Sequence, residues 1–153
     1  MNEIYDIAPV STKPLIFISI FGMLMLFILG LFSYILYSSK YTTFEISEQG
    51  LRIQRTMYGR TLPARAFIPE EARQVNLRSD SMLRLRRRNN GVGLPGYQAG
   101  WFRMKNGDKA LVFVTDPSCV VYLPTREGYA LLLSVEKPDA FLQSFQRMIS
   151  NLG

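Results

Sequence analysis

One uncharged segment limits what this chain can fold into. Residues 15–37 read LIFISIFGMLMLFILGLFSYILY, 23 positions without a charged side chain. At 1.5 Å per residue, a helix of this length is about 35 Å long, enough to cross about 30 Å of hydrocarbon with some tilt. The roughly 115 residues that follow are too few to bury every face of such a helix in a soluble core. The segment therefore predicts a transmembrane helix.

The flanking residues support a retained anchor rather than a cleaved signal peptide. Lys13 and Lys40 bracket the segment, and three tyrosines suit the interface at its C-terminal end: Tyr34, Tyr37 and Tyr41. A signal peptide would begin with basic residues, whereas Glu3 and Asp6 precede the first lysine, and no small-x-small cleavage site follows.

The distribution of basic residues predicts the orientation. The tail before the segment, residues 1–14, carries Lys13 alone, whereas Lys40, Arg52 and Arg55 follow the segment closely. Cytoplasmic flanks carry the excess of Lys and Arg, so the C-terminal part is expected in the cytoplasm.

Composition argues against catalysis. The chain has no histidine, which removes the commonest general base and metal ligand together. Its single cysteine, Cys119, excludes an intrachain disulfide and a cysteine-based zinc site. Ser and Thr lack an activating base, and Glu70, Glu71 and Asp80 have no evident partner acid. We therefore expect no catalytic residue, no metal ligand and no cofactor.

From residue 42 the apolar pattern becomes that of short strands. Glu48-Gln49-Gly50 indicates a hairpin, and Asn106-Gly107 is the preferred pair for a type I′ turn between two further strands. Strands are also expected after Asp116-Pro117 and at 129–133. In total, about seven short antiparallel strands are predicted.

The chain ends in a predicted amphipathic helix, residues 138–152. Pro138 suits a helix start, and Asp139 favours the first turn. Apolar residues then recur at helical spacing: Phe141, Leu142, Phe145, Met148, Ile149 and Leu152. Their stripe is expected to cover the open end of the sheet.

Three stretches resemble the bacterial membrane-associated pleckstrin-homology-like (PH-like) domains: MYGRTLPARAFI, GVGLPGYQAGWFRMKNGDKALVFVTDPSCVVYLPT and GYALLLSVEKPDAFLQSF. The resemblance covers about residues 42–150. It implies an α+β fold, with an antiparallel β-barrel of about seven strands capped by the C-terminal helix. The expected organisation is a tail (1–14), a transmembrane helix (15–37) and a PH-like domain (42–153), single-pass in the bacterial cell (inner) membrane.

Residues 91–96, GVGLPG, match the G-x-G-x-x-G pattern of dinucleotide-binding sites, and Asp116 follows twenty positions later. That site needs a helix directly after the glycines, whose N–H groups hold the pyrophosphate. YQAGWFRMKNG predicts no helix, and Pro95 removes an N–H donor. The glycines are instead expected to form a tightly turning loop.

A basic cluster precedes this motif, and its role stays open. Arg84, Arg86, Arg87 and Arg88 are either a solvated strand end or a contact for anionic lipid, with Tyr97 close by. Nucleic acid is not expected, although aromatic residues could stack bases, because Trp101 or Phe102 should face the core.

These observations predict a non-catalytic module that binds a protein or peptide partner, since domains of this kind can accept a peptide along a sheet edge. The alternative is a domain that binds or senses an anionic lipid surface through Arg84–Arg88.

Overall fold

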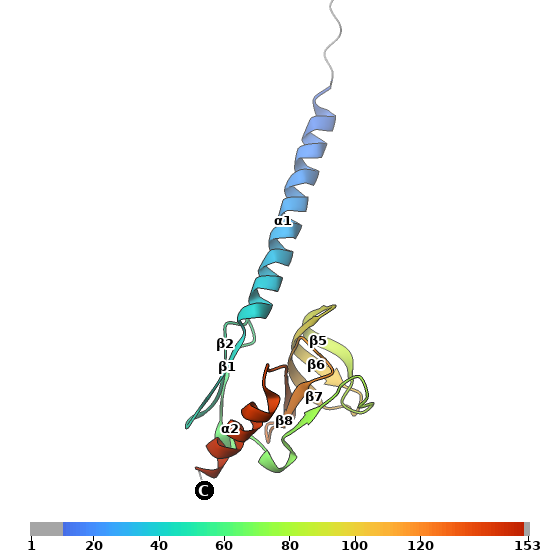
Figure 1. Cartoon of the computed structure of the whole chain (residues 1–153). Coiled ribbons are helices and arrows are strands. Elements are labelled where there is room, and N and C mark those ends of the chain that lie inside the picture. The colour runs from blue at the N-terminus through green and yellow to red at the C-terminus, as the bar shows by residue number, and fades with distance from the viewer. Residues whose placement is uncertain (1–10, 152–153) are drawn as a thin grey trace, which may run out of the picture. The chain divides into compact units, whose positions relative to one another are not determined.

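The computed structural model describes residues 11–151 and divides the chain into two compact units, Met1–Lys40 and Tyr41–Gly153 (Figure 1). Most of the predicted tail, residues 1–10, and the last two predicted helix positions, 152 and 153, lie outside the described residues. The side chains of Lys40 and Tyr41 are likewise not described.

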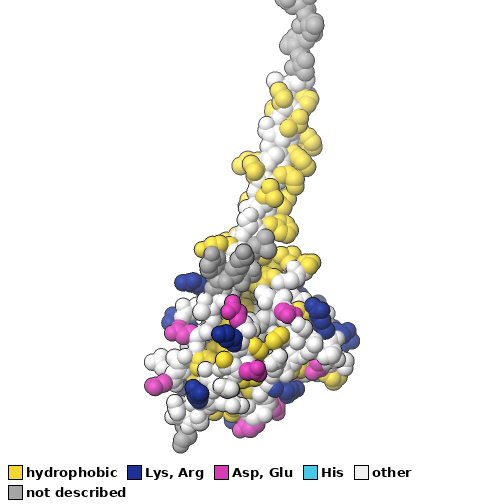
Figure 2. Space-filling model, viewed as in Figure 1, with side chains coloured by type: hydrophobic (Ala, Val, Ile, Leu, Met, Phe, Trp, Pro, Cys, Tyr) yellow, Lys and Arg dark blue, Asp and Glu magenta, His cyan; other side chains and the backbone are white. Residues whose placement is uncertain are grey.

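The described part of the first unit is almost entirely helix α1, Lys13–Tyr41, whose last residue belongs to the second unit and which contains the whole predicted segment 15–37. Its start is held by Ser11, whose hydroxyl accepts the Lys13 N–H at 3.4 Å. Large apolar side chains are exposed along the helix, including Phe17 (71%) and Met23 (77%) (Figure 2). By length and composition, Lys13–Ile35 qualifies as a membrane span, so this apolar helix suggests membrane anchoring.

The second unit begins with a three-stranded antiparallel sheet: β1 (Thr43–Ser47), β2 (Gly50–Gln54) and β3 (Thr61–Pro63). Ser47 pairs with Gly50 across the two-residue turn Glu48-Gln49, which confirms the first predicted hairpin. Two short 3-10 helices follow, η1 (Ala64–Ala66) and η2 (Pro69–Glu71).

Six further strands form a second sheet in the order β4-β8-β9-β7-β6-β5. They are β4 (Arg73–Val75), β5 (Leu85–Leu94), β6 (Tyr97–Met104), β7 (Lys109–Val114), β8 (Val120–Pro124) and β9 (Tyr129–Leu133). The described residues therefore contain nine strands in two sheets rather than about seven in one barrel. The expected α+β class with mostly antiparallel strands is confirmed, with one exception: a short turn makes β9 antiparallel to β8, and β9 then lies beside β7 and pairs with it in parallel.

The central strands of the second sheet are buried on both faces, which explains the continuous apolar runs of β7, β8 and β9. On one face, Phe102 and Val112 pack with Leu77 and Leu83 from the chain between β4 and β5. On the other face, Phe113 meets Phe44 of β1, with ring centroids 6.0 Å apart.

Helix α2, Pro138–Ser150, closes the unit (Figure 1). The predicted start at Pro138 is confirmed, and the helix ends two residues before the predicted end, with Asn151 as its C-cap. Phe145 and Met148 are buried, and the Phe145 ring meets Phe67 edge-on at 5.1 Å. The helix contacts β1, β4, β8 and η1, so its apolar stripe covers the junction of the two sheets.

The Asn106-Gly107 hairpin forms as predicted, but its turn type differs. Gly107 is left-handed (φ 96°), whereas Asn106 has no positive φ. The Gly107 N–H bonds to the Met104 carbonyl, and the Met104 N–H bonds to the Asp108 carbonyl. This is a type I turn followed by a glycine bulge, because a type I′ turn needs positive φ at both central residues.

Candidate functional site

The glycine motif lies in a β-hairpin rather than in the predicted loop. Gly91 and Gly93 belong to β5, and Gly96 (φ 77°) forms the turn into β6. No helix follows these glycines before Pro138, so the arrangement that holds a pyrophosphate does not form.

The glycines are explained by close packing. Gly91 faces Gly100 on β6, and a Cβ on Gly91 would lie 2.3 Å from the Ala99 carbonyl oxygen. A Cβ on Gly100 would approach both Gly91 and the ring of Tyr58. The Tyr58 hydroxyl donates to Oδ1 of Asn90 at 3.2 Å. The glycine pair therefore lets the β2–β3 loop pack onto the hairpin.

The arginine cluster lies on and next to the outer strand of the second sheet. Arg86, Arg87 and Arg88 belong to β5 and are exposed, and none of them forms an ion pair with the described part of the chain. Arg84 precedes the strand and donates to the Arg78 carbonyl. The β5–β6 register shifts twice, once at either side of Arg87 and Arg88.

Tyr97 lies elsewhere than these three arginines. Its side chain is only 8% exposed, and with Arg84 it lines a small pocket of about 250 Å³ near Pro95 and Pro117. The structure thus brings Arg84 and Tyr97 to one pocket and leaves Arg86, Arg87 and Arg88 on the strand. That these residues contact lipid or a partner stays a prediction.

The two sheets have four edge strands, and they differ in how well they are protected against pairing with another chain. β3 and β4 have three residues each, and β3 ends at Pro63. β5 is long, but its arginines and its two register shifts are devices that disfavour further pairing. β1 has five residues without proline, lysine or a register shift, and its one charged side chain, Glu45, accepts a hydrogen bond from Gln54 of β2. Among the described edge strands longer than three residues, β1 is therefore the less protected one.

The register shows which backbone groups of β1 are available. The Ile53 N–H bonds to the Arg60 carbonyl at 2.8 Å, so the backbone of Ile53 points away from β1. Phe44 is opposite Ile53, and Ile46 is opposite Leu51, two residues along. Along an antiparallel pair, positions whose N–H and C=O groups face the partner strand alternate with positions whose groups face away from it. Phe44 and Ile46 are two positions apart and both of the second kind, so their N–H and C=O groups point away from β2.

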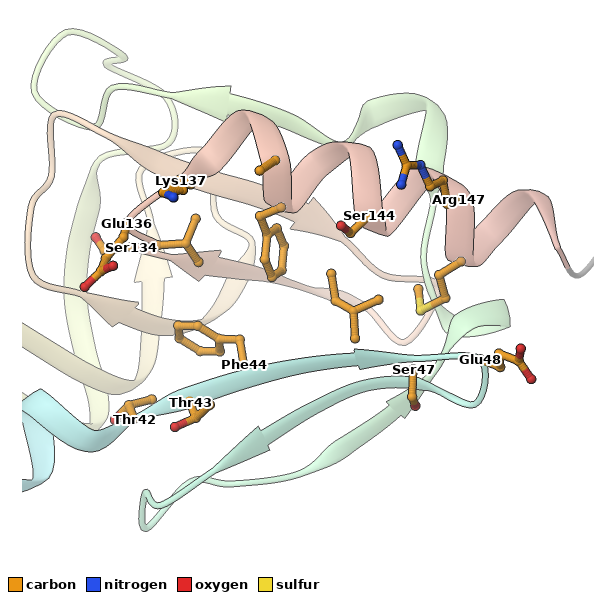
Figure 3. A pocket seen from close by; sticks show the side chains of 15 residues that line it. Thr42, Thr43, Phe44, Ser47, Glu48, Ser134, Glu136, Lys137, Ser144 and Arg147 are labelled. Carbon is orange, nitrogen blue, oxygen red and sulfur yellow. The ribbon is translucent and has the colours of Figure 1, made fainter.

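This open edge borders a groove of about 940 Å³ between β1 and α2 (Figure 3). Apolar side chains form much of its lining: Phe44, Ile46, Val135, Ala140, Phe141 and Met148. Polar and charged side chains lie around them: Ser47, Glu48, Ser134, Glu136, Lys137, Ser144 and Arg147. Each end of the groove has one acid and one base, Glu136 with Lys137 and Glu48 with Arg147, as Figure 3 shows.

Sequence reasoning missed this groove. Two features of the sequence pointed to it. Apolar residues alternate along β1, and the apolar stripe of α2 contains more residues than the two that are buried. Their juxtaposition joins residues more than ninety positions apart, which no local pattern reports.

A second cluster joins the β2–β3 loop to the six-stranded sheet. The Arg60 guanidinium lies 5.1 Å from the Trp101 ring centroid and donates to the Tyr129 hydroxyl at 3.1 Å. That hydroxyl donates to Glu127 at 3.0 Å. Burial raises the pKa of Tyr129, which the hydrogen bond from Arg60 opposes. The hydroxyl is therefore protonated at neutral pH and serves as a structural link.

No group of three or more His, Cys, Asp or Glu side chains within residues 11–151 is placed to hold a metal ion. A family model described as a bacterial PH domain matches residues 42–149, which is most of the chain and nearly all of the second unit. The comparison with curated proteins and the comparison with solved structures each found no match.

Proposed function

The chain belongs to the bacterial PH domain family, and from this premise we propose that it is a membrane-anchored, non-catalytic module that binds a protein partner through an extended segment. The segment adds as a strand to the open edge of β1 and lies in the groove beside α2. Main-chain hydrogen bonds supply affinity in this mode, and pockets for alternate side chains supply specificity.

One observation carries the proposal. The less protected edge, β1, is also the edge that borders the apolar groove. Proteins usually protect an exposed edge strand, because it can template aggregation. The arginines of β5 protect that strand in this way. The groove beside this open edge has a volume of about 940 Å³, which is large enough to take several residues of a peptide.

The expected affinity is modest. Phe44 and Ile46 together offer four backbone groups, and net gains of about 0.5–1.5 kcal/mol per hydrogen bond give about 2–6 kcal/mol before the cost of association. Apolar side chains that enter the groove add to this, so partner recognition depends on both the backbone ladder and the apolar lining.

We further propose that α1 anchors the protein as a single-pass span in the bacterial cell (inner) membrane, with the second unit in the cytoplasm. The exposed apolar side chains of α1 support the anchoring, because they require an apolar environment. The excess of basic residues after the span supports the orientation.

The backbone ladder gives a sharp test. Proline in place of Ile46 removes the outward N–H and leaves the bonds between β1 and β2 intact, whereas alanine removes the side chain and keeps the N–H. With a photo-crosslinking residue in place of Ser144, which lines the groove, the full-length protein should capture its partner in native membranes. Capture should fall strongly in Ile46→Pro and less in Ile46→Ala.

A photo-crosslinking residue in place of Ser150, on α2 but outside the groove, is the matched control. Equal capture from both positions, or equal capture by the proline and alanine variants, would contradict pairing at β1.

A second candidate function rests on Arg86, Arg87 and Arg88. They are exposed without carboxylate partners on one strand, and each basic side chain close to an anionic membrane contributes about 1 kcal/mol. The full-length protein in nanodiscs should bind vesicles containing anionic lipid at low salt, and a triple alanine variant should lose this binding. Neutral vesicles are the control, and unchanged binding by the triple variant would rule this function out.

A further inference from the structure

The position of β1 in the chain bounds where the groove can lie. Helix α1 ends at Tyr41 and β1 begins at Thr43, so Thr42 alone separates them. An extended chain spans at most about 3.6 Å per residue, which places the Phe44 backbone within about 11 Å of the end of α1. This bound holds at any angle between the two units.

The same reasoning gives a limit relative to the bilayer. Tyr41 follows Tyr37, the last residue of the apolar run, by four helical residues, or about 6 Å. The open edge at Phe44 therefore lies at most about 17 Å from the hydrocarbon boundary. The headgroup layer takes about 5–8 Å of this distance. An occupant that pairs with Phe44 therefore lies, at that point, within about 9–12 Å of the membrane surface.

Resting on the proposed function, we infer that the occupant is the extended juxtamembrane segment of a different membrane-spanning chain. Such a segment is held at this depth by its own span, so binding becomes an encounter at high effective concentration. Tethering also compensates for the modest affinity of a two-residue ladder.

A second copy of this chain does not fit the groove in the same way. Its own juxtamembrane residues on this side are β1, which is held in the hairpin with β2 and therefore supplies no free extended segment to lie in the groove. Its N-terminal residues precede the opposite end of α1, a helix about 43 Å long. An extended occupant of the groove is thus a segment of a different chain, and a dimer joined β1 to β1 is the alternative that the crosslinking test below separates from it.

The lining indicates what the segment looks like. It alternates apolar residues, because Phe44, Phe141 and Met148 line the groove. It needs no net charge, because one acid and one base line each end of the groove (Figure 3). This separates it from any ligand of the arginines on β5.

The test reconstitutes the full-length protein in phosphatidylcholine proteoliposomes, whose zwitterionic lipid minimises the arginine contribution. The probe is a synthetic membrane-spanning peptide followed directly by the segment Thr-Val-Thr-Ile-Thr-Val. The same hexapeptide without a span is the free probe. Apparent affinity is measured by fluorescence transfer, and contact by a photo-crosslinking residue in place of Ser144.

The tethered probe should bind about 100-fold or more tightly than the free hexapeptide. Ile46→Pro should strongly weaken binding of both probes, with Ile46→Ala as the variant that keeps the backbone donor. A flexible Gly/Ser insert of about twelve residues between Lys40 and Tyr41 should remove most of the tethered advantage and leave the free probe unaffected.

The outcomes separate the two proposals. Equal affinity for tethered and free probes, with both weakened by Ile46→Pro, would overturn the juxtamembrane inference and keep pairing at β1. If Ile46→Pro changed the affinity of neither probe, both the juxtamembrane inference and the pairing at β1 would be overturned. A crosslinked product consisting of two copies of this chain would also overturn the inference.

Discussion

At the scale of single residues, Gly100, which lies opposite Gly91 of the glycine motif, is constrained both by its backbone angle and by close packing. Its φ is 112°, and a Cβ there would lie 2.5 Å from the Asn90 carbonyl oxygen. Gly100→Ala should lower the free energy of unfolding by about 2–4 kcal/mol, combining backbone strain with steric overlap. Thermal or chemical denaturation of the full-length protein in detergent measures the change.

Gly93→Ala is the control for this prediction. Gly93 has no positive φ, and the nearest atom to a Cβ there is a flexible arginine tip at 3.6 Å. The free energy of unfolding of Gly93→Ala should stay close to that of the natural chain. If both variants were equally stable, the close approach of β5 and β6 would not be the reason for Gly100.

Asp116 provides a prediction about pH. Its carboxylate accepts the hydroxyl of Ser118 at 2.6 Å and the Ser118 N–H at 2.9 Å. These hydrogen bonds lower the pKa of Asp116. Because the folded pKa is depressed, the stabilisation is present above the ordinary carboxyl pKa and is lost as the pH falls through the folded value.

Carbon-detected NMR titration should therefore show the pKa of Asp116 below 3.8, its ordinary value. Ser118→Ala removes the strongest hydrogen bond, so the pKa should rise toward that value. An unchanged pKa in this variant would mean that Ser118 is not the cause.

At the scale of elements, α2 depends on one anchor. Phe145 is fully buried and meets Phe67 edge-on at 5.1 Å. Phe145→Ala should cost about 3–5 kcal/mol of stability, because the cavity lies where α2 covers both sheets. Gln146→Ala, exposed on the next position, should change stability by less than about 0.5 kcal/mol.

Hydrogen exchange would locate this effect. Loss of protection in Phe145→Ala should concentrate in α2 and β1, which border the same groove. A uniform loss across both sheets would instead indicate that α2 unfolds only together with the whole second unit.

At the scale of the whole molecule, the proposed anchoring depends on α1 alone. Leu26→Arg places a charge near the middle of the apolar run, which costs about 2.5–3.5 kcal/mol in membrane insertion. The share of protein that resists alkaline carbonate extraction should fall, whereas Leu26→Ala should leave it nearly unchanged. Equal extraction of both variants would show that α1 does not anchor the chain.

The sequence by itself determined the elements whose physics is local. The apolar run 15–37, the turns at Glu48-Gln49 and Asn106-Gly107, and the start of α2 at Pro138 were all recognisable, because length, turn chemistry and helix periodicity act between near neighbours. The family resemblance over 42–150 agrees closely with the match over 42–149.

The tertiary structure alone decided what depends on distant pairing. It inserted β9 between β8 and β7, turned the supposed glycine loop into a strand packed under Tyr58, and buried Tyr97. It also made β1 an edge strand and set it across a groove from α2. An edge strand is defined by which strands fail to adjoin it, and no window of sequence contains that information.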